Sequence, residues 1–224
     1  MAPSAIILAF EGVLCDPENH QIVAWQRTLS ILGWQLSEAE ARLSVELHDL
    51  EFLRMLFEKH GVPDADLEAW IRRKQKLAVS LFRDAPRFYP GARELIEALT
   101  PRARLVLVSD TWRENVTAAL KAAGLERGFE LILAQDEGSS ATSVLQRRQD
   151  ALDQLAIPPS LVRAVEGTPA GASASQVVGI PCVAIGHMRD FGDWVGNATY
   201  VSGLLPIQGL LSQLGFEPPS RPDR

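Results

Sequence analysis

The chain of 224 residues contains few cysteines and no long apolar run. Two cysteines, Cys15 and Cys182, cannot make a disulfide framework, so we expect two free intracellular thiols, at least one of them buried. No apolar stretch approaches the roughly 20 residues that a membrane-spanning helix needs. The apolar N-terminus lacks a basic segment and is interrupted by Glu11, which argues against a secretory signal. We therefore expect a cytoplasmic protein without membrane contact.

An excess of positive charge is also missing. The net charge is −6 and the pI is near 5.3, which argues against a broad surface for nucleic acid or anionic lipid. One basic run, Arg72-Arg73-Lys74-Gln75-Lys76, lies in a helical pattern. We interpret this run as a solvated helix face, so that no nucleic-acid partner is expected.

Short apolar segments are present in a regular order. Five of them predict buried strands, at residues 5–9, 104–109, 128–133, 162–165 and 181–185. Apolar runs of this length without polar alternation are typical of strands that are covered on both faces of a parallel sheet. Helical patterns separate them, at residues 91–100, 112–123, 143–155 and 170–179. This alternation predicts a doubly wound parallel α/β sheet.

Residues 17–84 interrupt the alternation. Apolar residues recur there at helical spacings, and the segment contains no strand candidate. Pro86 and Tyr89-Pro90-Gly91 mark the return to the α/β part. We predict a core domain of residues 1–16 and 85–216, with a helical domain of residues 17–84 inserted into it. The proline-rich tail, residues 217–224, is predicted to be disordered.

Local motifs accompany this layout. Residues 6–14 read IILAFEGVL, residues 88–92 FYPGA, residues 107–109 LVS, residues 165–171 VEGTPAG and residues 179–186 GIPCVAIG. In this order and at this spacing they resemble the haloacid dehalogenase (HAD) superfamily, in particular its beta-phosphoglucomutase-like branch. The resemblance extends from residue 5 to about residue 201. It implies a Rossmann-like HAD core in which residues 17–84 form the helical cap domain.

The same resemblance implies that the family's phosphoryl-transfer residues are altered. The position of the nucleophilic Asp is Ala9, and that of the second, acid–base Asp is Glu11. The position of the family's Lys is Thr142 or a neighbour within residues 139–143, and no Lys follows Lys121. The nearest cations are two arginines, which we expect one turn into the following helix and on other faces: Arg147 and Arg148.

The metal site implied by the resemblance is altered too. Family members hold Mg²⁺ with acidic residues of the motif at 165–171, where Glu166 remains and Gly167 replaces an Asp. Since such sites rely on one or two carboxylates, we expect Mg²⁺ to bind weakly or not at all. Ser109, with the turn of Glu11 and Gly12, is a candidate anion site. The alternative is that Ser109 only ends a strand and caps the next helix.

Two further positions complete the candidate ligand site, Asp110 and Thr142. Asp110 follows Ser109 and lies either at the pocket rim or, in the alternative interpretation, on the surface or at a helix N-cap. Taken together, Ala9, Thr142 and Gly167 favour a catalytically inactive pseudo-phosphatase, a regulatory module that binds a protein partner or a small anionic, phosphorylated ligand. One alternative is a hydrolase, phosphatase or phosphomutase that uses Glu11 in non-standard chemistry. Another is a structural subunit of an oligomer.

Overall fold

A computed structural model describes residues 2–62, 65–136, 143–187 and 198–216. The chain divides into two compact units. The first unit consists of Met1–Asp16 and Arg87–Arg224, and the second of Pro17–Pro86. Each unit has its own secondary structure and its own packing, and each is described in turn.

The first unit contains a six-stranded sheet in the order β3-β2-β1-β4-β5-β6, in which every neighbouring pair is parallel. The strands are β1 Ala5–Ala9, β2 Arg104–Trp112, β3 Leu131–Gln135, β4 Val162–Glu166, β5 Cys182–Ile185 and β6 Thr199–Val201. The order runs outward from β1 in both directions, which confirms the predicted doubly wound α/β fold. The short edge strand β6 was not predicted, because three residues give no periodic signal.

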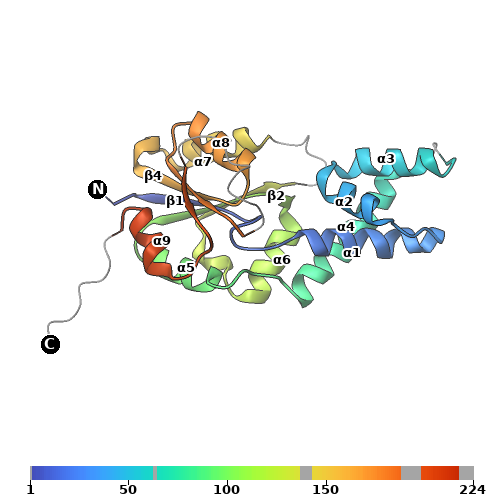
Figure 1. Ribbon diagram of the computed structural model, residues 1–224, viewed down its shortest axis with the longest axis horizontal. Coiled ribbons are helices and arrows are strands. Elements are labelled where there is room, and N and C mark those ends of the chain that lie inside the picture. Colours follow the sequence, from blue (N-terminus) through green and yellow to red (C-terminus); the bar gives the residue numbers. More distant parts are fainter. Residues whose placement is uncertain (1, 63–64, 137–142, 188–197, 217–224) are drawn as a thin grey trace. The chain divides into compact units, whose positions relative to one another are not determined.

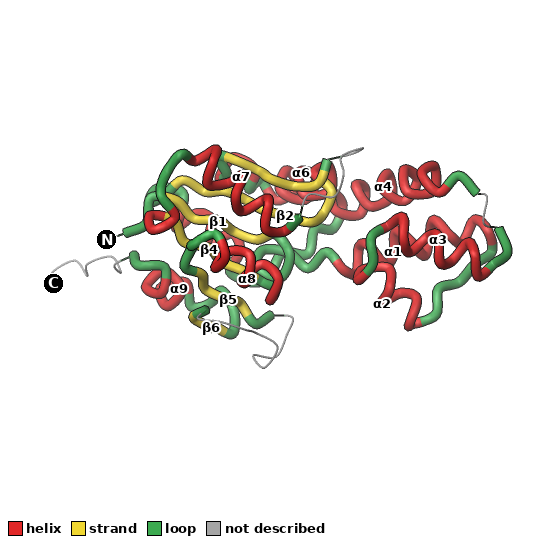
Figure 2. Tube along the Cα trace, turned by 90° about the horizontal axis from the view of Figure 1, so that it is seen from above, coloured by secondary structure: helices red, strands yellow, loops and turns green. Residues whose placement is uncertain are grey.

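Helices cover both faces of this sheet. They are α5 Ala92–Leu99, α6 Arg113–Ala123, α7 Val144–Leu155, α8 Pro169–Val177 and α9 Ile207–Gln213, with 3-10 turns η2 Glu126–Gly128 and η3 Pro159–Leu161. Figure 1 shows α7 and α8 on one face and α5, α6 and α9 on the other. Seen from above, α7 and α8 lie over the strands (Figure 2). Because η2 occupies residues 126–128, β3 begins three residues later than predicted.

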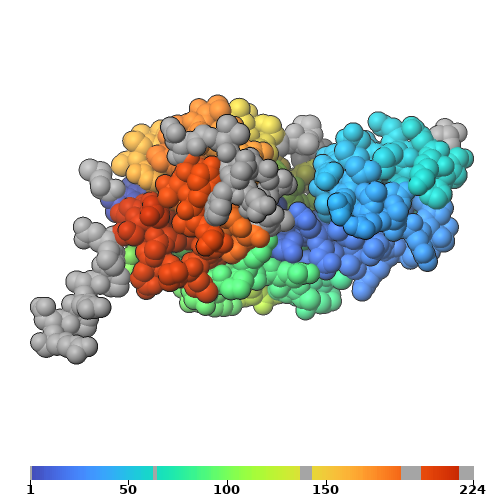
Figure 3. All heavy atoms as spheres, in the orientation of Figure 1, coloured from blue at the N-terminus to red at the C-terminus, as the bar shows by residue number. Residues whose placement is uncertain are grey.

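The central strand β1 is fully buried, as its unbroken apolar sequence predicts. It lies between β2 and β4, and only a small dark-blue area marks the start of the chain in the space-filling view (Figure 3). β2 continues beyond the predicted end, to Trp112, with a register shift against β3 between Val108 and Trp112. Near this irregular end of β2, the Ser109 hydroxyl and the Thr111 N–H reach the side chain of Glu11, which follows β1.

In its described part, residues 17–62 and 65–86, the regular secondary structure of the second unit is made up of helices, with no strand. It contains α1 Glu18–Leu29, the 3-10 turn η1 Ser30–Leu32, α2 Glu38–Glu46, α3 Asp49–Lys59 and α4 Leu67–Asp84. Ser37 and Glu40 form a reciprocal capping box at the start of α2. The Asp66 side chain accepts from the Ala69 N–H and caps α4.

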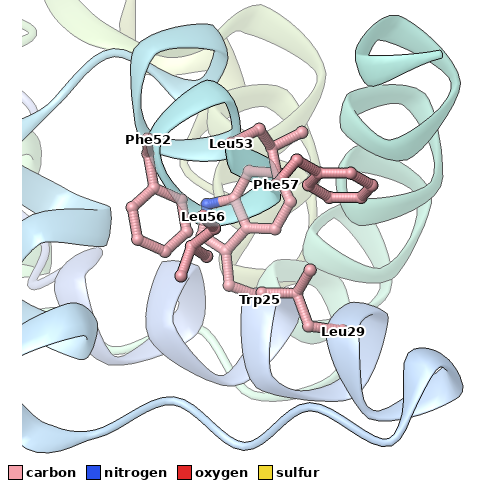
Figure 4. Close-up of a cluster of buried hydrophobic side chains, with 6 residues drawn as sticks. All are labelled: Trp25, Leu29, Phe52, Leu53, Leu56 and Phe57. Carbon is pink, nitrogen blue, oxygen red and sulfur yellow. The ribbon is translucent and has the colours of Figure 1, made fainter. Parts of the chain in front are cut away.

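An aromatic and aliphatic cluster holds the helical unit together (Figure 4). Its buried members come from α1 and α3, and they are Trp25, Leu29, Phe52, Leu53, Leu56 and Phe57. Trp25 and Phe52 make a tilted ring contact at 5.5 Å between centroids. Burial of these side chains contributes on the order of 2 kcal/mol each, which stabilises helices that are too short to form alone.

The basic run of α4 is not the uniformly solvated face that we predicted. Lys74 is only 2% exposed, and its Nζ lies 3.0 Å from each carboxylate oxygen of Asp49 on α3. The same ammonium lies over the Trp25 ring, 5.2 Å from its centroid. The pattern failed because a helix in a bundle buries a face regardless of the charges on it, provided that each buried charge has a partner.

Both thiols, Cys15 and Cys182, are free and buried. Burial raises the pKa of Cys15 to about 12 and that of Cys182 to about 11, so neither is a nucleophilic thiolate at neutral pH. Among the described residues, no helix is both long enough and apolar enough to cross a membrane.

Candidate functional site

Polar residues lie at or near the carboxyl ends of three adjacent strands, at one edge of the sheet. Glu11 follows β1, Ser109 lies near the end of β2, and Glu166 is the last residue of β4. The carboxyl ends of parallel strands meet at the same edge, and the strand order reverses direction here, between β1 and its neighbours. This is the place where open α/β sheets bind ligands.

Ala9 is the last residue of the central strand. It pairs with Val108 of β2 and is 5% exposed. Its methyl group lies at the centre of the carboxyl edge and provides neither a nucleophile nor a metal ligand.

The Glu11 carboxylate is bound by its own chain. Its Oε1 accepts from the Ser109 hydroxyl at 2.5 Å and from the Thr111 N–H at 2.9 Å. Burial, followed by the charge of Asp110, raises the pKa of Glu11 above its ordinary value of 4.5, although the hydrogen bonds from Ser109 and Thr111 oppose the rise. The Ser109 hydroxyl and the Thr111 N–H, which are suited to binding an external anion, therefore bind the Glu11 carboxylate of the chain itself.

Ser109 and Asp110 differ from the helix-cap interpretation. The N-cap of α6 is Trp112, which makes no side-chain capping bond, and the Ser109 hydroxyl binds Glu11 instead. Asp110 has a side chain that is 56% exposed and accepts an ion pair from Arg147 at 3.1 Å. Cap assignment failed because β2 extends three residues beyond Ser109.

Glu166 has no exposed surface and is bound by an arginine. Arg148 forms a bidentate ion pair with it, with Nη2 2.7 Å from Oε2 and Nε 3.2 Å from Oε1. The Ser175 hydroxyl donates to Oε1 at 2.6 Å. We had expected Arg147 and Arg148 on other faces of α7, and that expectation was wrong. Although neighbouring helical residues diverge, both long side chains reach the carboxyl edge of the sheet.

Gly167 and Gly12 bring two loops into close backbone contact. A Cβ atom on Gly167 would lie 2.4 Å from the Glu11 carbonyl oxygen and 2.5 Å from the Gly12 Cα. Gly12 itself has a φ of +70°, and a Cβ there would lie 2.7 Å from the Gly167 carbonyl oxygen. The position where the resemblance implies an Asp is thus closed to any side chain unless the backbone moves.

The residues do not fit a magnesium ion. Both oxygens of Glu166 are engaged by Arg148 and Ser175, and Gly167 supplies no carboxylate. Within the described part of the chain, no group of three or more His, Cys, Asp or Glu side chains is arranged to hold a metal ion. A divalent ion would have to displace a guanidinium that is itself buried.

Comparison with protein families identifies the family of the chain. The family model described as haloacid dehalogenase-like hydrolase matches residues 6–185. The chain belongs to the haloacid dehalogenase-like hydrolase family. None of the curated proteins compared with the chain matches it.

Solved structures resemble the chain over most of their length. CbbY from Rhodobacter sphaeroides, in complex with phosphate, is 21% identical with a TM-score of 0.77, over 92% of this chain and 96% of that one. Beta-phosphoglucomutase from Clostridium difficile is 16% identical with a TM-score of 0.73, over 95% and 97%. A HAD-superfamily hydrolase from Geobacter sulfurreducens is 19% identical with a TM-score of 0.71, over 93% and 96%. At these identities the likeness establishes the fold.

Within this HAD-like core, the structure brings together most of the residues singled out in the sequence. Glu11 and Ser109 are in contact, and Gly12 and Gly167 are packed together. Thr142 lies outside the described residues. Sequence reasoning named Arg148 but missed its pairing with Glu166, and it missed Ser175 and Thr111, although one signal was available. A buried Glu166 needs a cation, and the arginines that precede it in the sequence, Arg147, Arg148 and Arg163, were the candidates.

Proposed function

We propose that this chain is a non-catalytic HAD-like protein, a pseudo-phosphatase that acts as a binding or regulatory module for a partner protein or a small anionic ligand. The observation that carries the proposal is the methyl group of Ala9 at the end of the central strand, where an attacking carboxylate would be needed. Without it, no aspartyl-phosphate can form.

The neighbouring residues support the same conclusion. Glu11 and Glu166 are the carboxylates left at the edge of β1 and β4, and each is bound within the chain, by Ser109 and by Arg148. A small anion that uses the Ser109 hydroxyl has to displace the Glu11 carboxylate. We therefore expect inorganic phosphate and sugar phosphates to bind more tightly to Glu11→Gln than to the natural chain.

One observation favours a second function. Burial and Asp110 raise the pKa of Glu11, and a raised carboxyl pKa is a property of general acids and bases in hydrolases. In this candidate, Glu11 activates water without a covalent intermediate. It requires the Glu11 carboxylate to leave the Ser109 hydroxyl and the Thr111 N–H.

Turnover of a panel of phosphate esters separates these functions. We expect the natural chain, Glu11→Gln and the exposed control Glu94→Gln to release no phosphate, with or without Mg²⁺. Turnover that is lost in Glu11→Gln and kept in Glu94→Gln would establish the hydrolase and overturn the non-catalytic proposal.

Binding is then measured on the same proteins. A ligand that binds the folded chain raises its unfolding temperature without being consumed. At a ligand concentration a hundredfold above Kd, the free energy of unfolding rises by about 2.7 kcal/mol. A defined oligomer in size-exclusion chromatography that no phosphate ester affects would instead indicate a structural subunit.

A further inference from the structure

Five charged side chains gather at the carboxyl edge of the sheet. Glu11, Asp110 and Glu166 come from the ends of β1, β2 and β4, and Arg147 and Arg148 come from α7. Carboxylates from neighbouring strand ends make a natural cation site in an α/β sheet. Here the cations that reach this edge are part of the chain.

Arg148 uses its whole guanidinium group. Its Nε and Nη2 bind the two oxygens of Glu166, and its Nη1 donates to the Val144 carbonyl at 3.2 Å. The arginine side chain is 5% exposed and that of Glu166 is 0% exposed. A planar guanidinium binds a carboxylate in this bidentate geometry better than any other side chain does.

The electrostatics keep Arg148 charged. Burial alone would lower its pKa, but the charges of Glu166, Asp110 and Glu11 raise it above the ordinary value. The Arg148 guanidinium thus pairs with Glu166 and is also attracted by the charges of Asp110 and Glu11. An incoming metal ion would leave this cation buried without a counter-charge, which is strongly unfavourable.

Small residues make room for the pair. A Cβ on Gly171 would lie 2.3 Å from Glu166 Oε2 and 3.1 Å from Arg148 Nη2, so the first turn of α8 accommodates the ion pair only with glycine there. Gly167, by its contact with the Glu11 carbonyl, leaves no room for a second metal-binding carboxylate. The local sequence therefore suits a guanidinium and excludes an acidic metal cage.

We infer that Arg148 is a built-in cation that takes the place of a divalent metal in this chain, so that whatever the site binds, it binds without a metal. The inference rests on the proposed non-catalytic function, in which the site has no phosphoryl-transfer step that needs Mg²⁺. Arg148 acts through Glu166 and is a positioning residue.

Metal binding by the natural chain is the first test. Calorimetric titration with Mg²⁺ and with Mn²⁺, and thermal unfolding with either ion or with EDTA, are expected to show no binding and the same midpoint. Saturable binding of either ion in the millimolar range or tighter, with a raised midpoint, would overturn the inference.

Variants then show whether Arg148 is the reason. Arg148→Met is expected to lower the unfolding midpoint by on the order of 10 °C and to let Mn²⁺ raise it again through the vacated Glu166. The exposed control Arg127→Met should change neither value. If Arg148→Met does not fold, Arg148→Lys is used as the test variant instead, because the ammonium keeps the charge but not the bidentate contact. Its midpoint should fall less and should not rise with Mn²⁺, because the ammonium would be left buried without a counter-charge. Arg148→Met as stable as the natural chain or indifferent to Mn²⁺, or Arg148→Lys stabilised by Mn²⁺, would contradict the inference.

The two proposals fail in different ways. Phosphate release by the natural chain in EDTA would overturn the non-catalytic function and leave the metal-free site intact. A rise in midpoint with Mg²⁺ and no phosphate release would overturn the role of Arg148 and leave the non-catalytic function intact.

Discussion

Replacing Gly171 by alanine sets helix propensity against the buried ion pair. Gly171 lies in the first turn of α8, and alanine is favoured over glycine within a helix by roughly 1 kcal/mol. Propensity alone therefore predicts a more stable protein. The new Cβ, however, would lie 2.3 Å from Glu166 Oε2 and 3.1 Å from Arg148 Nη2, so the structure predicts a less stable one.

The loss of stability in Gly171→Ala depends on how firmly the Glu166 carboxylate is bound. Its carboxylate cannot simply turn away, because Ser175 and Arg148 bind its oxygens. Breaking a buried ion pair completely costs roughly 3–5 kcal/mol. Allowing for partial loosening and for the gain in propensity, we expect a net loss of about 2 kcal/mol. In a chain of this size that corresponds to a fall in Tm of roughly 4–8 °C.

The assay is thermal unfolding by calorimetry, with a glycine-to-alanine control in another helix. Gly209 lies in α9, and nothing is within 4 Å of a Cβ added there. Gly209→Ala should therefore gain up to about 1 kcal/mol from propensity alone. If Gly171→Ala is at least as stable as the natural chain and its Tm rises as that of Gly209→Ala does, the ion pair does not depend on this glycine and the reasoning is refuted.

Four other predictions concern both units. Ala9→Asp should release no phosphate from the ester panel with Mg²⁺, because the cation and metal positions stay altered; release would contradict this. Gly167→Asp should lose about 2–4 kcal/mol in urea unfolding, since its Cβ would lie 2.4 Å from the Glu11 carbonyl. Because burial raises the pKa of Glu11 above 4.5, its stabilising contribution is full below the ordinary pKa and is lost as the pH rises through the raised one, so the natural chain should lose stability relative to Glu11→Gln as the pH rises above 4.5. Lys74→Met should cost about 2–4 kcal/mol by leaving Asp49 without its ammonium, and adding Asp49→Asn should recover most of it.

The fold could be predicted because its signals are local. The apolar run of β1 and the helical patterns between later strands carry their own periodicity, and the doubly wound sheet follows from their order. The edge strand β6 could not be predicted, since its three residues pair only through β5. The extension of β2 through Ser109 to Trp112 was missed for the same reason, because β3 and a register shift determine it.

The candidate site could be located but its contacts could not be predicted. Glu11, Ser109 and Glu166 were identified by the resemblance of their local sequences to HAD motifs, and the structure brings the first two together. Which donor meets which carboxylate depends on side-chain reach across strands. Sequence spacing contains no information on that, so Arg148 was placed on the wrong face.

A retained carboxylate is weak evidence for a retained reaction, and Glu166 shows why. With no exposed surface, an unpaired carboxylate there would cost several kcal/mol. The sequence then has two stable solutions, to lose the carboxylate or to provide a cation, and Arg148 provides one. Once paired, Glu166 is needed to neutralise Arg148, because a buried guanidinium alone is as costly as a buried carboxylate. Each charge thus sustains the other by folding stability, and the pair persists whether or not the site performs any chemistry.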